Sequence, residues 1–191
     1  YYPTAYSRDA ARESLALFEE IGDRRNAAIS RLVVAWEGQY DGDADHYRAM
    51  IARSRDELGD SDDGWWRGMT HYLDALLSLR CGEFDASARQ WRDSLDRIRP
   101  TGDRIIGNAI LAHLGIALRE AGRRMAALTV LRETVDDARG LGSLHGLAFA
   151  LAHLAHTRLD LDESDDVTAL LAEADEIARR AQNPRCQAWA A

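Results

Sequence analysis

The stretch of sequence that decides the fold is a glycine followed by Asp or Ser, which occurs as Ile21-Gly22-Asp23, Leu58-Gly59-Asp60, Thr101-Gly102-Asp103 and Leu141-Gly142-Ser143. Each copy ends a run of helical periodicity, and the copies recur at similar but unequal intervals along the chain. A glycine after a helix favours a left-handed stop, and the Asp or Ser that follows can cap the next helix. The interval is roughly 40 residues, a period typical of stacked helical hairpins.

Apolar residues follow a helical period in the runs between these copies. In the first run, Ala11, Leu15 and Phe18 mark one face at positions i, i+4 and i+7. Shorter breaks, such as those at Gly82 and Gly122, divide the later runs into pairs, and no segment alternates as a strand would. We therefore predict an all-α solenoid of antiparallel helix-turn-helix hairpins. It forms one domain over 1–191, with hairpins at roughly 24–59, 62–100, 104–141 and 144–182 and a partial repeat at each end.

Charge and hydropathy exclude two classes of partner. Of the 191 residues, 46% are hydrophobic and 29% charged, and the formal net charge is −8. All 24 basic residues are Arg, and opposite charges alternate along the helices. A basic stripe for phosphate contacts is therefore missing, and we expect no direct nucleic-acid binding by this segment. We expect no membrane span either, because the most apolar stretch, 147–155, is short and includes His153.

The cysteines and the chain ends suggest a cytoplasmic fragment. Cys81 and Cys186 lack metal-binding spacing, and two isolated thiols suit a reducing compartment better than a disulfide framework. The chain begins at Tyr1 and ends at Ala191 on an unfinished helical run, so we expect a piece of a longer protein. Cut ends of a solenoid would expose apolar faces, which makes a homodimer possible.

Motifs for catalysis and metal binding are incomplete. The sequence has no phosphate loop, no HExxH and no nucleophile elbow. Aspartates at 41, 43 and 45 resemble the first ligands of a calcium loop, but His46 occupies its glycine position and Ala52 its Glu position. We therefore predict no catalytic residue, no cofactor and no metal.

Two short clusters leave alternatives open. His153 and His156 lie one helical turn apart and could share a zinc ion, but a third ligand is not evident, which favours packed or surface histidines. Trp65 and Trp66 open a helix. They could divide between the core and its rim, or form an aromatic anchor for a partner.

The third hairpin resembles a tetratricopeptide repeat (TPR). Large, small and turn residues stand where that family has them, at Leu111, Leu114, Gly115, Leu118, Gly122, Ala127 and Leu131. The second repeat matches at Gly82, Phe84 and Trp91, but has Ala75 in place of the usual Gly and Ser87 in place of the usual Ala. The fourth has Asp162 at the turn-glycine position. The resemblance implies close helix crossings at Gly115 and Ala127.

Residues 13–25 give a narrower resemblance. They resemble repeats found C-terminal to nucleotide-binding modules in large actinobacterial transcriptional regulators of the ATP-dependent STAND type. This implies a non-catalytic sensor or protein-interaction domain of such a regulator, which binds a protein, a peptide, an effector or another domain of the same chain. A free-standing peptide or protein adaptor and a small-molecule pocket within the superhelix are the alternatives.

The TPR resemblance also implies a concave binding face, lined by the first helix of each hairpin. The positions that face inward in that family correspond in this chain to Arg25, Leu32, Trp36, Met69, Tyr72, Leu76, Arg80, Ala112, Ile116, Arg119, Glu120, Phe149, His156 and Asp160. Arg and aromatic residues on one face suit a peptide or protein ligand. The predicted groove residues are Arg25, Trp36, Tyr72, Arg80, Ile116, Arg119, Glu120, His156 and Asp160. The alternative is that several of them pack against the neighbouring helix.

Overall fold

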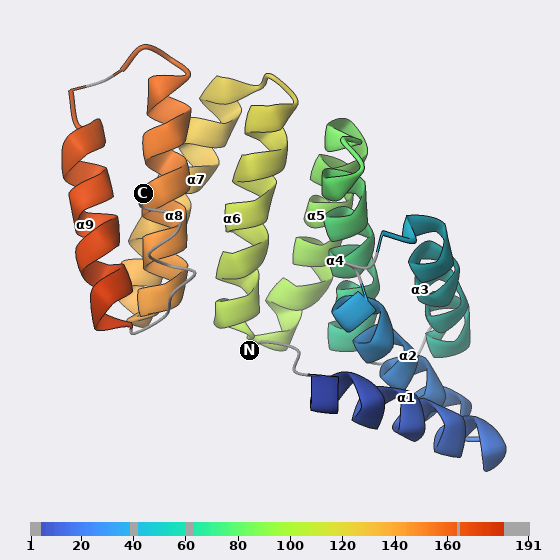
Figure 1. Ribbon diagram of the computed structural model, residues 1–191. Coiled ribbons are helices and arrows are strands. Elements are labelled where there is room, and N and C mark those ends of the chain that lie inside the picture. The colour runs from blue at the N-terminus through green and yellow to red at the C-terminus, as the bar shows by residue number, and fades with distance from the viewer. Residues whose placement is uncertain (1–4, 39–41, 60–62, 164, 182–191) are drawn as a thin grey trace. The chain divides into compact units, whose positions relative to one another are not determined.

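The computed structural model describes residues 5–38, 42–59, 63–163 and 165–181. These residues contain nine α-helices, one short 3-10 helix and no strand, which confirms the predicted all-α helix-turn-helix architecture (Figure 1). The α-helices are α1 (Ala5–Glu20), α2 (Arg24–Gly38), α3 (Ala44–Leu58), α4 (Gly64–Arg80), α5 (Phe84–Ile98), α6 (Arg104–Glu120), α7 (Arg124–Leu141), α8 (Leu144–Leu159) and α9 (Val167–Arg180). None of the described helices has the length and the apolar character that crossing a membrane requires.

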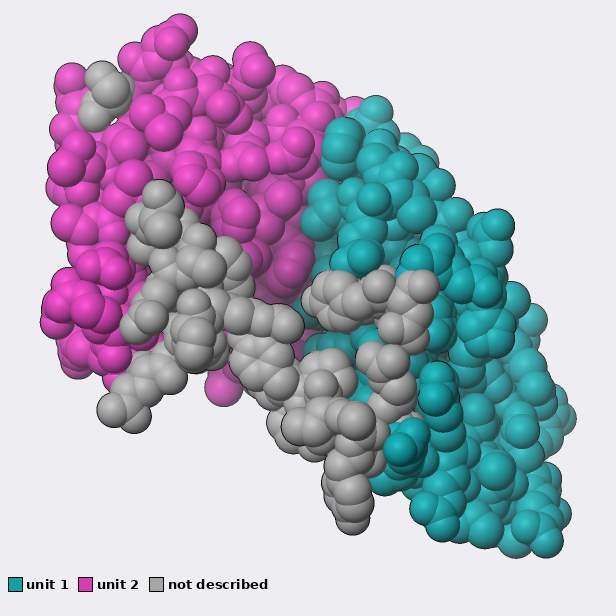
Figure 2. All heavy atoms as spheres, viewed as in Figure 1, with its two compact units in different colours: residues 1–101 teal, residues 102–191 magenta. Residues whose placement is uncertain are grey.

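The helices form two compact units, shown in different colours in Figure 2. Unit 1 (Tyr1–Thr101) holds α1 to α5, and unit 2 (Gly102–Ala191) holds α6 to α9. Within each unit, every helix packs against the next one along the chain. Helix α2 starts at Arg24 and α6 at Arg104, and the starts of α4 and α8 differ by the same offset. This shared offset pairs each position on the first helices of unit 1 with a counterpart in unit 2.

Left-handed glycines end the helices where the sequence predicts them. Gly22, Gly59, Gly102 and Gly142 all have positive φ, between 52° and 78°. After α1, the Gly22 N–H donates to the Glu19 carbonyl (3.3 Å) and the Asp23 N–H to the Phe18 carbonyl (2.9 Å), which is a Schellman motif. The Asp23 side chain then accepts from the Asn26 N–H (3.0 Å), and Asp103 and Ser143 cap α6 and α8 in the same way. Asp60 lies outside the described residues.

The turns inside the hairpins repeat this geometry at equal intervals, at Gly82, Gly122 and Asp162. Gly82 and Gly122 have φ of 76° and 75°, and Asp162 takes the same conformation with φ 58°. Among described non-glycine residues, Asp162 alone has positive φ. The left-handed region is costly for a residue with a side chain, although Asp tolerates it better than most.

Close helix crossings hold each hairpin together. A Cβ on Gly115 would lie 2.5 Å from Cγ of Leu131, so only glycine lets α6 approach α7 here, as the sequence predicts. Ala127 is fully buried in the same hairpin. At the equivalent crossing of α4 and α5, Ala75 and Ser87 stand in place of the Gly and the Ala. There the Ser87 hydroxyl donates to the Ala75 carbonyl at 2.8 Å. A hydrogen bond thus satisfies the buried hydroxyl between these two helices.

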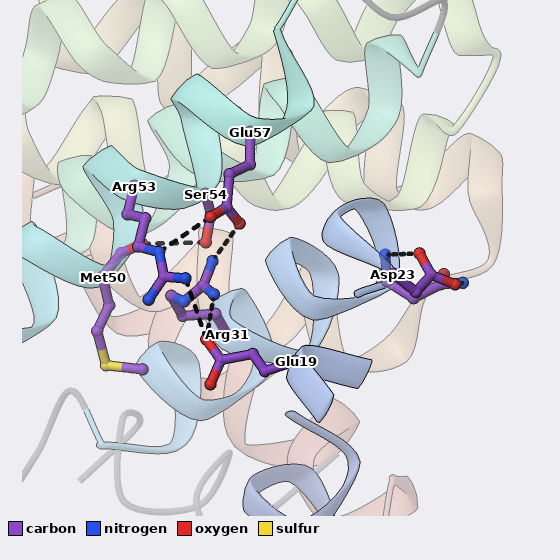
Figure 3. Close-up of polar contacts among 8 residues, drawn as sticks. Glu19, Asp23, Arg31, Met50, Arg53, Ser54 and Glu57 are labelled. Carbon is purple, nitrogen blue, oxygen red and sulfur yellow. Dashed lines mark hydrogen bonds and ion pairs between the residues drawn. The ribbon is translucent and has the colours of Figure 1, made fainter. Parts of the chain in front are cut away.

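A cluster of ion pairs joins α1, α2 and α3 (Figure 3). Arg31 on α2 is only 3% exposed and donates to Glu19 of α1 and Glu57 of α3, each at 2.7 Å. Arg53, whose side chain is 59% exposed, reaches the same carboxylates at 3.2 and 2.9 Å. Burial tends to raise the pKa of Glu57, but hydrogen bonds from the two arginines outweigh it and lower that pKa. The cluster therefore keeps the Glu57 carboxylate ionised inside unit 1.

Candidate functional site

A pocket of about 250 Å³ lies between α2 and α4 of unit 1. Its walls are almost entirely apolar, and the residues that line it are Leu32, Val33, Trp36, Glu37, Trp65, Trp66, Met69 and Leu73. Both helices are first helices of hairpins, the position that the TPR resemblance assigns to a binding face. Trp36 was predicted for this face. Trp65 and Trp66 are both half-buried at the pocket, so neither of them is the core residue that the core-and-rim alternative expected.

Helical register explains why these side chains meet. The α2 residues stand at positions i, i+1, i+4 and i+5, and the α4 residues at i, i+1, i+4 and i+8, so each set covers one face of its helix. Leu32, Met69 and Leu73 are at most 2% exposed and form the floor of the pocket. The larger indole rings rise from this floor and form its walls.

The rings around the pocket are held by other aromatic residues. Trp36 stacks on Tyr72, with ring centroids 5.5 Å apart and planes inclined by 24°. Tyr72 in turn meets the fully buried Trp91 edge to face at 4.8 Å. Trp65 and Trp66 contact each other edge to face at 4.7 Å. These contacts restrict how the indoles can turn, so the pocket walls are built before a ligand arrives.

Glu37 is the one charged residue among the described residues that line the pocket. It is 4% exposed and lies one residue from the end of α2.

The other groove residues predicted in unit 1 have separate surroundings. Arg25 forms an ion pair with Asp63, which precedes α4. Tyr72 is only 6% exposed, so it belongs to the core beneath the pocket as much as to its face. Arg80 is exposed at the end of α4. The structure therefore brings Trp36 and Tyr72 together and leaves Arg25 and Arg80 nearer the helix ends.

At the equivalent positions of unit 2, three aromatic rings contact one another. By the offset between the two units, the counterparts of Val33, Met69 and Leu73 are His113, Phe149 and His153. Phe149 lies between the two histidines, with ring centroids 5.2 Å from His113 and 4.5 Å from His153.

Both histidines in contact with Phe149 stay neutral at physiological pH. Burial lowers the pKa of His113, and burial together with nearby Arg119 lowers the pKa of His153 to about 3. His153 also meets His156 edge to face at 6.1 Å. Burial among aromatic rings fits the packed interpretation of His153.

The predicted groove residues of unit 2 gather near the ends of α6 and α8. Arg119 donates to Glu120 at 2.6 Å and lies 3.7 Å from Asp160. Ile116 and His156 are half-buried on the preceding turns of these helices. This makes a polar, self-paired surface that differs in character from the aromatic pocket of unit 1.

The described residues offer no metal site. They contain no group of three or more His, Cys, Asp or Glu side chains that could hold an ion. Asp43 caps α3 by accepting from the His46 N–H at 3.0 Å, which gives this aspartate a structural role. Asp41 and Cys186 lie outside the described residues. A second pocket, of about 230 Å³, adjoins the Arg31 cluster, where arginines already pair with its carboxylates.

Sequence reasoning did not identify Glu37 as part of a site. The signal that could have found it is the repetition of bulky aromatics on facing first helices, Trp36 beside Glu37 and the Trp65-Trp66 pair. Periodicity gives the face of each residue but not whether the neighbouring helix fills the space opposite.

Comparisons with known proteins support the fold. No family model and no curated protein matches the chain. Among solved structures, aspartyl phosphate phosphatase F from Bacillus subtilis is similar over 95% of this chain and 50% of its own, at 10% identity and a TM-score of 0.83. PlcR from Bacillus thuringiensis, solved with the peptide PapR7 and DNA, is similar over 92% of this chain and 66% of its own, at 9% identity and 0.75.

A third solved structure carries the repeat type in its description. The TPR-like repeats of a putative kinesin light chain from Podospora anserina are similar over 92% of this chain and 86% of their own, at 14% identity and a TM-score of 0.71. The chain spans half the length of the Bacillus subtilis protein and about two thirds of PlcR. These similarities show that the chain has a TPR-like helical-repeat fold.

Proposed function

We propose that this chain is a non-catalytic module that binds a protein or peptide segment on the first helices of its hairpins. The observation that carries the proposal is the pocket between α2 and α4, whose walls include three tryptophans. Tryptophan is enriched among the residues that dominate protein-binding energies. At about 250 Å³, the pocket is smaller than typical small-molecule sites of roughly 300–1,000 Å³, which favours one side chain of a partner over a free ligand.

The remaining predicted groove residues would offer further contacts within each unit. In unit 1, Arg25, Tyr72 and Arg80 lie on or beside the helices that carry the pocket. In unit 2, Ile116, Arg119, Glu120, His156 and Asp160 would offer a second, polar contact surface. We propose these as secondary contacts, because Arg119 with its two carboxylates can exchange internal ion pairs for pairs with a ligand.

We further propose that the chain is one repeat domain of a cytoplasmic bacterial transcriptional regulator. The support is the resemblance of residues 13–25 to repeats of STAND-type regulators, together with the similarity in fold to PlcR, which was solved with DNA. The partner would then be a protein, a peptide or another domain of the same chain. The full-length gene tests this: a phosphate loop or a DNA-binding helix-turn-helix is expected, and the lack of both would refute the regulator context.

Selection from a phage-displayed random peptide library tests the binding function. We expect clones that bind the purified chain and weaken at least about tenfold with Trp66→Ala, because a central aromatic residue contributes about 2 kcal/mol or more. Met125→Ala is the matched control, since Met125 is an exposed hydrophobic residue of α7, 62% accessible and far from the pocket in sequence. Circular dichroism checks that both variants remain folded. Clones that bind equally well to Trp66→Ala and the wild type would refute the proposal.

A further inference from the structure

We propose that the pocket between α2 and α4 receives the side chain of a phenylalanine from the partner segment. The phenyl ring would lie among the indoles of Trp36, Trp65 and Trp66, above the apolar floor of the pocket. This inference rests on the proposed function and deepens it, because it names the residue type that the site selects.

The first argument is that the pocket offers almost no polar surface. Its walls are almost entirely apolar, and Glu37, the charged residue among the described lining residues, is 4% exposed and already interacts within the chain. A charged or amide side chain would therefore give up its hydrogen bonds to water and find few replacements. An indole or a phenol would carry a polar atom into the same surroundings, where such an atom usually needs a partner. Phenylalanine is the largest side chain that avoids these costs.

The second argument is size. A dry apolar cavity of about 150 Å³ accommodates a benzene molecule. The pocket of about 250 Å³ therefore has room for a phenyl ring together with the methylene group that joins it to the backbone of the peptide. Leu32, Met69 and Leu73 beneath it are at most 2% exposed, so they give the ring an apolar surface to contact. A ring that leaves water for this space is stabilised in proportion to the apolar area that it buries.

The third argument separates an aromatic ring from an aliphatic side chain of similar size. Trp65 and Trp66 meet edge to face, and Trp36 stacks on Tyr72, so the indoles are held in fixed orientations around the pocket. Aromatic rings in stacked or edge-to-face geometry attract each other beyond the effect of the buried area. This additional attraction corresponds to about two- to tenfold in affinity, and an aliphatic side chain does not obtain it.

Unit 2 contains an internal example of such a ring. By the offset that relates the two units, Phe149 on α8 is the counterpart of Met69 on α4. The centroid of its phenyl ring lies 5.2 Å from that of His113 on α6 and 4.5 Å from that of His153 on α8, so the ring joins the two first helices. Unit 1 has a methionine at this position and a pocket beside it. The partner would therefore supply in unit 1 the ring that Phe149 supplies in unit 2.

The test begins with peptides selected for Trp66-dependent binding, resynthesised with one residue changed. We expect a phenylalanine in these peptides whose replacement by alanine weakens binding at least about tenfold. Cyclohexylalanine, which keeps the six-membered ring but not its aromaticity, should weaken binding about two- to tenfold. Tyrosine should weaken it at least about fivefold, because the added hydroxyl would lack a hydrogen-bond partner.

A variant of the chain tests the comparison with unit 2. Met69→Phe gives unit 1 the side chain that unit 2 has at this position, and its ring should occupy the pocket and weaken the selected peptides at least about tenfold. Met125→Phe is the matched control, because it makes the same substitution at a 62% exposed residue of α7 and should leave the affinity unchanged. Thermal denaturation shows whether Met69→Phe remains folded. A folded Met69→Phe variant that binds as tightly as the wild type would overturn the inference.

The outcomes separate the two proposals. Peptides that depend on Trp66 but carry no phenylalanine, or that bind equally well with cyclohexylalanine or tyrosine, would overturn the phenylalanine inference and leave the binding function intact. A failure to select any Trp66-dependent peptide would overturn the binding function itself. The peptide series uses the wild-type chain, so it is decisive even without the Met69→Phe variant.

Discussion

Two arginines on the same pair of carboxylates allow a direct test of how burial sets the contribution of an ion pair. Arg31 and Arg53 both contact Glu19 and Glu57 at 2.7–3.2 Å, but the Arg31 side chain is 3% exposed and the Arg53 side chain 59% exposed. We predict that Arg31→Met greatly destabilises the chain, whereas Arg53→Met is nearly neutral. Each substitution retains a long apolar side chain, so the comparison isolates the guanidinium.

The expected sizes follow from the two environments. Removing one partner of a buried pair costs about 3–5 kcal/mol, because Glu57, only 12% exposed, loses its buried partner and keeps only the exposed Arg53. An exposed pair contributes about 0–1 kcal/mol. Since 1 kcal/mol shifts the melting temperature of a chain of this size by about 2–4 °C, Arg31→Met should lower it by about 6–20 °C. Arg53→Met should lower it by less than about 4 °C.

Urea denaturation at neutral pH measures the loss of stability in each variant, and repeating it over a series of pH values adds an internal check. The pKa of Glu57 is lowered in the folded chain, so this carboxylate contributes stability above its ordinary value near 4.5. That contribution disappears as the pH falls below 4.5, and the difference between wild type and Arg31→Met should then narrow. Equal losses of stability for Arg31→Met and Arg53→Met would refute the reasoning. So would a stability difference between wild type and Arg31→Met that does not change with pH.

Three further predictions concern packing, protonation and backbone conformation. Gly115→Ala should be about 1–3 kcal/mol less stable in urea than Gly107→Ala, because a Cβ at Gly115 meets Leu131 while one at Gly107 meets nothing within 4 Å; equal stabilities would contradict this. Lowering the pH from 6.5 towards 3 should destabilise the chain by about 1.4 kcal/mol per unit through His153, whose pKa is about 3 when folded and near 6.5 when unfolded. The slope should flatten in His153→Gln, and an unchanged slope would argue against the buried neutral histidine. Asp162→Gly should raise stability by about 0.5–1 kcal/mol, because φ at this turn is 58°, and Gly122→Ala at the equivalent turn should lower it. Calorimetry that shows the same sign for both changes would exclude this explanation.

The helices and their ends could be predicted from the sequence because they depend on local chemistry. A glycine beyond an apolar run stops a helix through its own backbone freedom, and Asp23 caps through the backbone N–H of Asn26, a near neighbour in sequence. The tight crossing at Gly115 could be predicted because only small residues fit where two helices meet closely.

The site was harder to predict from the sequence because it depends on which side chains lie opposite each helix. Arg31 lies beside Leu32 in the sequence, and nothing in that pattern indicates that two distant glutamates bury its charge. Trp65 and Trp66 were recognised as a potential anchor, but the open space beside them depends on side chains from α2. The contact of His113 with Phe149 in unit 2 likewise joins two helices, because His113 stands on α6 and Phe149 on α8.

The aromatic contacts of unit 1 have an optical consequence. Trp36 at the pocket, Tyr72 beneath it and Trp91 in the interior form consecutive ring contacts at 5.5 and 4.8 Å. At these separations, light absorbed by Tyr72 passes readily to either indole, while Trp91 is shielded from aqueous quenchers. The emission of the pocket indoles Trp36, Trp65 and Trp66 should therefore respond to whatever occupies the pocket, whereas buried Trp91 contributes emission that water-soluble quenchers do not reach.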